Sequence, residues 1–260
     1  MKTLSLMSTA ALLLAAPAVF AAPAVGLVGD KTLVMFDTET RIVSGSMEVT
    51  GVDSLVGIDL RPSNNTLVGV TPDSTVVTID TATGAATELS KMNTPLTIGD
   101  APVVVDFNPM ADRLRFMTGT TNHRVNVDTG EVTVDGSLAF ETADMHAGEA
   151  PAIVAAAYTN SFGKPEATAM YDIDATIVAL IRQTAPNDGT LAAIGKLGIA
   201  APAASYAFDI QSTADLTNTA WLVNGATLYS VDLETGAATE AGSIEGADGD
   251  IRDITILPEM

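Results

Sequence analysis

The feature that most constrains the fold of this chain is a hairpin pattern that recurs along it. Three segments share one form, in which an alternating strand ends in Asp, a turn carries Thr-Gly, and a second alternating strand follows. They are VVTIDTATGAATEL (residues 76–89), HRVNVDTGEVTVDG (123–136) and LYSVDLETGAATEAG (228–242). Asp begins such a turn by accepting backbone N–H bonds, and Gly supplies the positive φ that a tight hairpin requires. The three segments therefore predict repeated antiparallel hairpins.

Two further copies extend the repeat. In LVMFDTETRIVSGSM (33–47) Arg41 replaces the glycine, and in TIVALIRQTAPNDGTLAAIG (176–195) the turn is longer. Upstream of the hairpins lie two more strand candidates, an apolar run such as PVVVDFNP (102–109) and then a short strand such as RLRFMTG (113–119). Each unit thus holds four strands in about 45–50 residues, which is the period of a β-propeller blade.

The two ends of the chain complement each other. IRDITILP (251–258) has the pattern of a first strand with nothing after it, and VGLVGDKTLVMFD (25–37) supplies a second and third strand with no first. Propellers close when a strand from one terminus completes the sheet begun at the other, so that no edge stays open. We therefore predict an all-β, five-bladed propeller of four-stranded blades, closed by pairing the C-terminal strand with the N-terminal blade. Two packed β-sandwiches are the alternative, but they leave this complementarity unexplained.

The first 21 residues have the features of a secretory signal peptide. Lys2 gives a basic start, LLLAAPAVFAA (12–22) is apolar, and small residues precede a cleavage site after Ala21. The apolar stretch is too short to span a membrane. We expect residues 22–260 to form a single domain that is periplasmic or secreted. Because the chain has no cysteine, disulfides, thiolate metal sites and cysteine nucleophiles are excluded.

The charge balance indicates which partners are compatible with the protein. The chain has 32 acidic and 12 basic residues, for a formal net charge of −20. Such a field repels nucleic acid and anionic lipid surfaces and attracts cations. We therefore expect no nucleic-acid partner and no membrane insertion, and a monomer that meets an extracytoplasmic ligand or protein.

Several blocks of the sequence resemble a known family. VDFNPMADRLR (105–115), HRVNVDTGEVTVDG (123–136), AAAYTNS (155–161) and PNDGTLAAIGKLG (186–198) are similar to the bacterial exported family called domain of unknown function 4394. The resemblance extends from about Val25 to Leu257 and implies a propeller-like fold and an extracytoplasmic location. It implies no activity and no catalytic residue, so the candidate site depends on the residues of this chain.

The first strands of the five units carry polar residues at one shared position. Aligned by their apolar cores, they place Asp59, Asp106, Tyr158, Asp209 and Asp253 there. Two residues later, on the same strand face, come Arg61, Asn108, Asn160, Gln211 and Thr255. Since the first strand of each propeller blade lines the central channel, the sequence predicts a channel with four carboxylates, a phenol and a second polar layer.

Three interpretations of this ring stay open. In the first, each Asp bonds backbone amides or an Arg of a neighbouring blade, through channel water. In the second, Asp59, Asp106, Asp209 and Asp253 hold a divalent cation such as Ca²⁺, which relieves the repulsion among them; no other cofactor is expected. In the third, the carboxylates serve a carbohydrate-active hydrolase or lyase. A non-enzymatic binding or scaffold module is the expected function, and the enzyme is the alternative.

Overall fold

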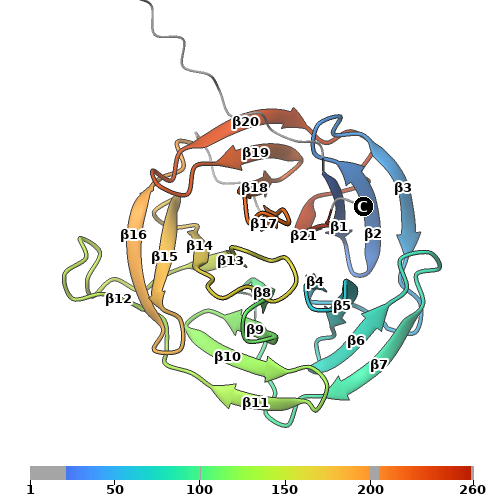
Figure 1. Cartoon of the computed structure of the whole chain (residues 1–260), viewed down its shortest axis with the longest axis horizontal. Helices are drawn as coiled ribbons and strands as arrows, with labels where there is room; N and C mark the ends of the chain where they lie inside the picture. The colour runs from blue at the N-terminus through green and yellow to red at the C-terminus, as the bar shows by residue number, and fades with distance from the viewer. Residues whose placement is uncertain (1–21, 100, 200–204, 259–260) are drawn as a thin grey trace, which may run out of the picture.

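The computed structural model describes residues 22–99, 101–199 and 205–258, and the predicted signal peptide lies outside these residues. The described residues form strands and turns with no helix. Figure 1 shows the strands as five small sheets arranged in a ring around one axis. None of the described residues belongs to a helix long and apolar enough to cross a bilayer. The predicted five-bladed β-propeller is confirmed.

Each sheet is one blade, numbered here in chain order. Blade 1 contains β4 (Gly57–Arg61), β5 (Thr66–Val70), β6 (Thr75–Ile79) and β7 (Ala86–Lys91). Blade 2 contains β8 (Val103–Asn108), β9 (Arg113–Thr118), β10 (Thr121–Asn126) and β11 (Glu131–Val134). Blade 3 contains β13 (Ile153–Tyr158), β14 (Met170–Asp174), β15 (Ala179–Ala185) and β16 (Thr190–Lys196), and the two-residue β12 (Ala139–Phe140) pairs in parallel with β16. Blade 4 contains β17 (Tyr206–Ser212), β18 (Asn218–Asn224), β19 (Thr227–Val231) and β20 (Ala238–Ser243).

The fifth blade, called the closing blade, joins the two ends of the described chain. It contains β21 (Ile251–Ile256), β1 (Pro23–Val28), β2 (Thr32–Asp37) and β3 (Val43–Glu48), in that order from the axis outwards. β1 and β21 are antiparallel, with Ala24 opposite Ile256 and Leu27 opposite Asp253. This pairing confirms the predicted closure and gives β1 a partner along its inner edge.

The hairpin turns follow the predicted chemistry in most of the repeats. Asp80 Oδ1 accepts the N–H groups of Ala82 and Thr83 at 2.8 and 3.2 Å, and Asp37 and Asp232 do the same in their own turns. In four of the turns the residue four positions after the capping residue has a positive φ. The values are 58° at Arg41, 75° at Gly84, 74° at Gly130, whose capping residue is Asn126, and 79° at Gly236. Arg41 therefore adopts the left-handed conformation that the other repeats assign to glycine.

Blade 2 differs in which residue caps its turn. The capping position is held by Asn126, whose Oδ1 accepts the Asp128 N–H at 3.1 Å. The carboxylate of Asp128 is therefore free of the turn and bonds Arg61 of blade 1.

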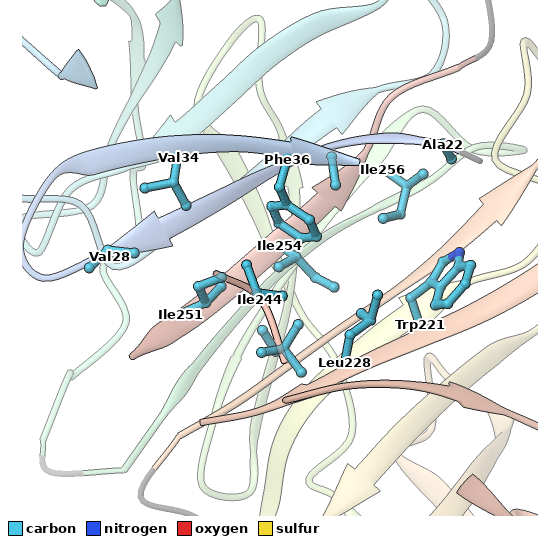
Figure 2. Close-up of a cluster of buried hydrophobic side chains, with 13 residues drawn as sticks. Ala22, Val28, Val34, Phe36, Trp221, Leu228, Ile244, Ile251, Ile254 and Ile256 are labelled. Atoms are coloured by element: carbon cyan, nitrogen blue, oxygen red, sulfur yellow. The ribbon is translucent and has the colours of Figure 1, made fainter. Parts of the chain in front are cut away.

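The hydrophobic core is divided among the junctions between neighbouring blades. The described residues form five buried clusters, and each cluster combines side chains of two adjacent blades. Figure 2 shows the cluster between the closing blade and blade 4, which includes Phe36, Ile254, Leu228 and Trp221. Trp221 is 1% exposed, so it is part of the core. Burial of apolar area at these junctions, at about 25 cal/mol per Å², therefore holds the ring together.

Candidate ligand-binding channel

Five inner strands surround the axis: β4, β8, β13, β17 and β21. Each of them contacts the inner strands of both neighbouring blades, and Figure 1 shows them closest to the centre of the ring. Three carboxylates from these strands converge. Asp59, Asp106 and Asp209 are buried, and each can place a carboxylate oxygen within 4.8 Å of the other two. Among the described residues, Asp253 lies outside this group of three.

Every channel aspartate also bonds the next blade. Each of the four carboxylates accepts a backbone N–H bond from the inner strand of its neighbour. The bonds run from Phe107 N to Asp59 Oδ2 (2.6 Å), from Tyr158 N to Asp106 Oδ1 (3.0 Å), from Ile256 N to Asp209 Oδ2 (2.6 Å) and from Ile58 N to Asp253 Oδ2 (2.7 Å). Inner strands of different blades share no β-ladder. The carboxylates thus satisfy N–H groups that would otherwise face the channel.

The junction between blades 3 and 4 uses different residues. Tyr158 holds the aspartate position in blade 3, and its hydroxyl accepts a bond from Arg115 Nε at 3.2 Å. Asn160 and Asn218 link the two blades instead. Asn160 N donates to Asn218 Oδ1, and Asn218 Nδ2 donates to Asn160 Oδ1, both at 2.8 Å.

Burial and mutual repulsion shift the acidity of the carboxylates. Burial, reinforced by the charge of Asp209, raises the pKa of Asp59 well above its ordinary value. Burial and the charge of Asp59 raise the pKa of Asp106 in the same direction. Burial raises the pKa of Asp209 to about 6 and that of Asp253 to about 8. A group of like charges out of water must hold protons or attract a cation to be stable.

The second polar layer divides into two groups. Gln211 and Thr255 line the cavity at the channel mouth; Thr255 Oγ1 donates to Asp59 Oδ1 at 2.9 Å, and Gln211 Oε1 accepts the indole N–H of Trp221 at 3.2 Å. The other three residues bond elsewhere. Asn108 Oδ1 accepts a turn N–H from Ala111, Asn160 joins blades 3 and 4 as described above, and Arg61 reaches out to blade 2.

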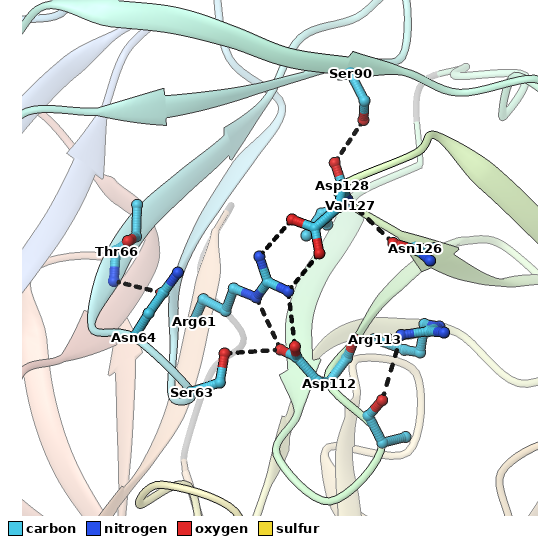
Figure 3. A network of polar contacts seen from close by, with 11 residues as sticks. Arg61, Ser63, Asn64, Thr66, Ser90, Asp112, Arg113, Asn126, Val127 and Asp128 are labelled. Carbon is cyan, nitrogen blue, oxygen red and sulfur yellow. Dashed lines mark hydrogen bonds and ion pairs between the residues drawn. The ribbon is translucent and has the colours of Figure 1, made fainter.

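Arg61 forms two ion pairs with residues of blade 2, shown in Figure 3. Its Nε and Nη2 donate to Asp112 at 2.8 and 2.7 Å, and its Nη1 and Nη2 donate to Asp128 at 2.7 and 2.8 Å. These bonds lower the pKa of both carboxyls. Strand alignment alone did not reveal this network, because the direction of a long side chain at a strand end depends on the neighbouring blade.

A cavity of about 240 Å³ opens at one end of the channel. Asp59, Asp209, Gln211 and Thr255 line it, together with Phe162, which is 39% exposed. Two of the three converging carboxylates therefore border a space that a small molecule or hydrated ion can enter. This combination of carboxylates, an amide and one aromatic ring suits a small polar ligand.

Two solved structures are similar to this chain. A solved structure of a protein of unknown function from Bacteroides thetaiotaomicron is 16% identical, with a TM-score of 0.51, over 92% of this chain and 65% of that chain. An auxiliary nutrient binding protein from Bacteroides ovatus is 11% identical, with a TM-score of 0.46, over the same shares of the two chains. This chain thus spans less than two thirds of the length of either protein.

No protein among the curated sequences matches the chain. The family described as domain of unknown function 4394 matches residues 32–255, nearly the whole propeller. The chain therefore belongs to the DUF4394 family.

Proposed function

We propose that this protein is an extracytoplasmic, non-enzymatic binding module whose channel holds a divalent cation, Ca²⁺, beneath a ligand-binding mouth. The observation that carries the proposal is the convergence of Asp59, Asp106 and Asp209 within 4.8 Å, below a cavity that two of them line. The predicted signal peptide and the net charge of −20 support the location, since an acidic surface suits an exported protein that meets cations and small solutes.

The chemistry of the three carboxylates supports a hard cation. Ca²⁺ takes six to eight oxygen ligands, including carboxylates and water. A carboxylate oxygen that accepts one N–H bond keeps a second lone pair, and the bonds from Phe107 and Ile256 orient the oxygens of Asp59 and Asp209. Three protein ligands leave positions for water or for a ligand oxygen from the mouth.

The same hydrogen bonds favour binding over hydrolysis. Both carboxylate oxygens of Asp59, Asp209 and Asp253 accept hydrogen bonds. Within the described part of the chain, Asp106 Oδ2 is the one channel carboxylate oxygen that receives none. A glycosidase needs a proton donor and a second carboxylate as base or nucleophile at a defined separation, so this arrangement is better suited to holding a ligand than to cleaving one.

Calcium binding can be measured on the mature protein by metal analysis, titration calorimetry, and thermal melts in chelator and in added Ca²⁺. We expect Ca²⁺ to raise the melting temperature, because a ligand at about 100 times its Kd stabilises the native state by about 2.7 kcal/mol. Asp106→Asn keeps the acceptor for Tyr158 N and removes one charge, so this variant should lose most of the response.

Asp188→Asn is the matched control, because Asp188 is an exposed residue on the outer turn between β15 and β16 and its variant should respond as the wild type does. The proposal is wrong if no metal co-purifies and if neither chelator nor Ca²⁺ changes the melting temperature of the wild type.

A further inference from the structure

Blade 3 contains a buried polar pair away from the channel. Asp172 on β14 is 0% exposed, and Gln183 on the adjacent β15 is 2% exposed. Gln183 Nε2 donates to Asp172 Oδ2 at 2.9 Å and lies 3.5 Å from Met117 Sδ of blade 2. The pair therefore faces the junction between blades 2 and 3.

The remaining oxygens of this pair are unsatisfied. Asp172 Oδ1 and Gln183 Oε1 are buried, and neither has a hydrogen-bond partner among the described residues. With an ionised Asp172 both atoms are acceptors only, and leaving two buried acceptors unpaired destabilises the folded state. One proton on the carboxyl satisfies both, because a carboxylic acid and a primary amide can form two parallel hydrogen bonds.

The burial of Asp172 also favours its protonated form. Burial raises the pKa of Asp172 to about 7, against the opposing effects of the Gln183 hydrogen bond and of Arg115 on β9, and Asp174 on the same strand makes a smaller contribution in the direction of burial. The guanidinium of Arg115 is already occupied, since its Nη1 donates to Asp135 Oδ2 at 2.6 Å and to Asn122 Oδ1 at 2.7 Å. No ion pair therefore joins Arg115 to Asp172 within the described residues.

We propose that Asp172 and Gln183 form a closed acid–amide pair, with Asp172 protonated on Oδ1 and donating to Gln183 Oε1, and that this pair is a proton-dependent lock between β14 and β15, on the face of blade 3 that packs against blade 2. When the proton leaves, Oδ1 becomes a buried anion that faces the lone pairs of Oε1. The lock is therefore complete in acid and is lost as the pH rises through the pKa of the folded protein, which is above that of an unfolded aspartate.

Infrared spectroscopy tests the proton directly. The difference spectrum between wild type and Asp172→Asn at about pH 5, below the folded pKa, should contain the C=O stretch of a protonated carboxyl. This difference band should fade with a midpoint near pH 7. Asp174→Asn, a matched substitution two residues along β14, should leave the band in place, because Asp174 accepts backbone N–H bonds from Ala152, Thr176 and Ile177. Absence of the band from the difference spectrum would overturn the proposal.

Stability provides a second readout. The side-chain amide that Asp172→Asn introduces can form both bonds to Gln183 without a charge, so the melting temperature of this variant relative to wild type should rise between about pH 5 and pH 8. A pH-independent difference would contradict the lock. If Asp172→Asn does not fold, the Gln183→Met variant provides the test. It removes both the Nε2 donor and the Oε1 acceptor that face Asp172, so the C=O band of the protonated Asp172 carboxyl should move to higher frequency. An unchanged band would refute the pair.

Discussion

At the scale of single residues, several long or charged side chains in this propeller bond a neighbouring blade instead of their own. Arg61 illustrates the effect, because it leaves the end of β4 and contacts two carboxylates of blade 2. Its side chain is 11% exposed, whereas those of Asp112 and Asp128 are 27% and 55% exposed. Partial exposure of the acids limits the stabilisation that charge alone provides. Much of the stabilisation therefore comes from the planar guanidinium, a fork of N–H donors that bonds both carboxylates.

We predict that Arg61→Lys destabilises the protein by about 1–2 kcal/mol, because an ammonium cannot bond two carboxylates through a planar fork. Urea unfolding would measure the loss. Lys91→Arg, a change at an exposed ion pair with Asp73, is the control and should change stability by less than about 0.5 kcal/mol. Equal effects of the two variants would argue against a special role for the fork.

At the scale of elements, the inner strands are connected by side chains because they share no β-ladder. Four junctions use an aspartate, and the junction between blades 3 and 4 uses Asn160 and Asn218. Asn160 has a φ of 61°, a left-handed conformation that asparagine tolerates better than most residues. The conformation and the reciprocal amide bonds together explain why an asparagine suits this position.

The asparagine link predicts coupling between the two residues. Asn160→Ala and Asn218→Ala should each cost about 1–2 kcal/mol. Asn160→Ala removes the acceptor of Asn218 Nδ2 and adds strain at a positive φ, and Asn218→Ala removes both bonds between the two residues. The double variant should cost clearly less than the sum, by about 0.5–1.5 kcal/mol in a double-mutant cycle. Additive losses would mean that the two amides act independently.

At the scale of the whole molecule, the buried carboxyls give stability an unusual pH dependence. Burial raises the pKa of Asp209 to about 6, that of Asp172 to about 7 and that of Asp253 to about 8. An unfolded aspartate has a pKa of about 3.9, so the native state holds more protons than the unfolded state between about pH 4 and pH 8. The free energy of unfolding therefore falls as the pH rises through this window.

We predict that, in chelator, stability is greatest near pH 4–5 and declines by several kcal/mol towards pH 8. Below about pH 4 it should fall again, because Asp112 and Asp128 lose their bonds to Arg61 when they are protonated. Chemical denaturation at a series of pH values measures the curve, and added Ca²⁺ should reduce the decline at high pH. A stability that increases from about pH 5 to pH 8 in chelator would show that the buried carboxyls are ionised at little cost.

The sequence by itself determined the repeat, the blade count and the closure of the ring. Hairpin turns are local chemistry: a capping side chain and a residue with positive φ lie within five positions of each other, as at Asp80 and Gly84. Strand alternation is equally local, and the missing first strand of the N-terminal blade is visible in the order of the segments. These features do not depend on which residues meet across a junction, which is why they could be predicted.

Only the tertiary structure decided what the polar residues bond. Alignment placed Asp59, Asp106 and Asp209 on one ring, but only the packing of neighbouring blades showed that each carboxylate accepts an N–H bond from the next inner strand. The Asp172–Gln183 pair lies on second and third strands, where no repeat position marks it. Contacts between blades join residues far apart in the chain, and their geometry depends on strand register and rotamer, which a local pattern does not encode.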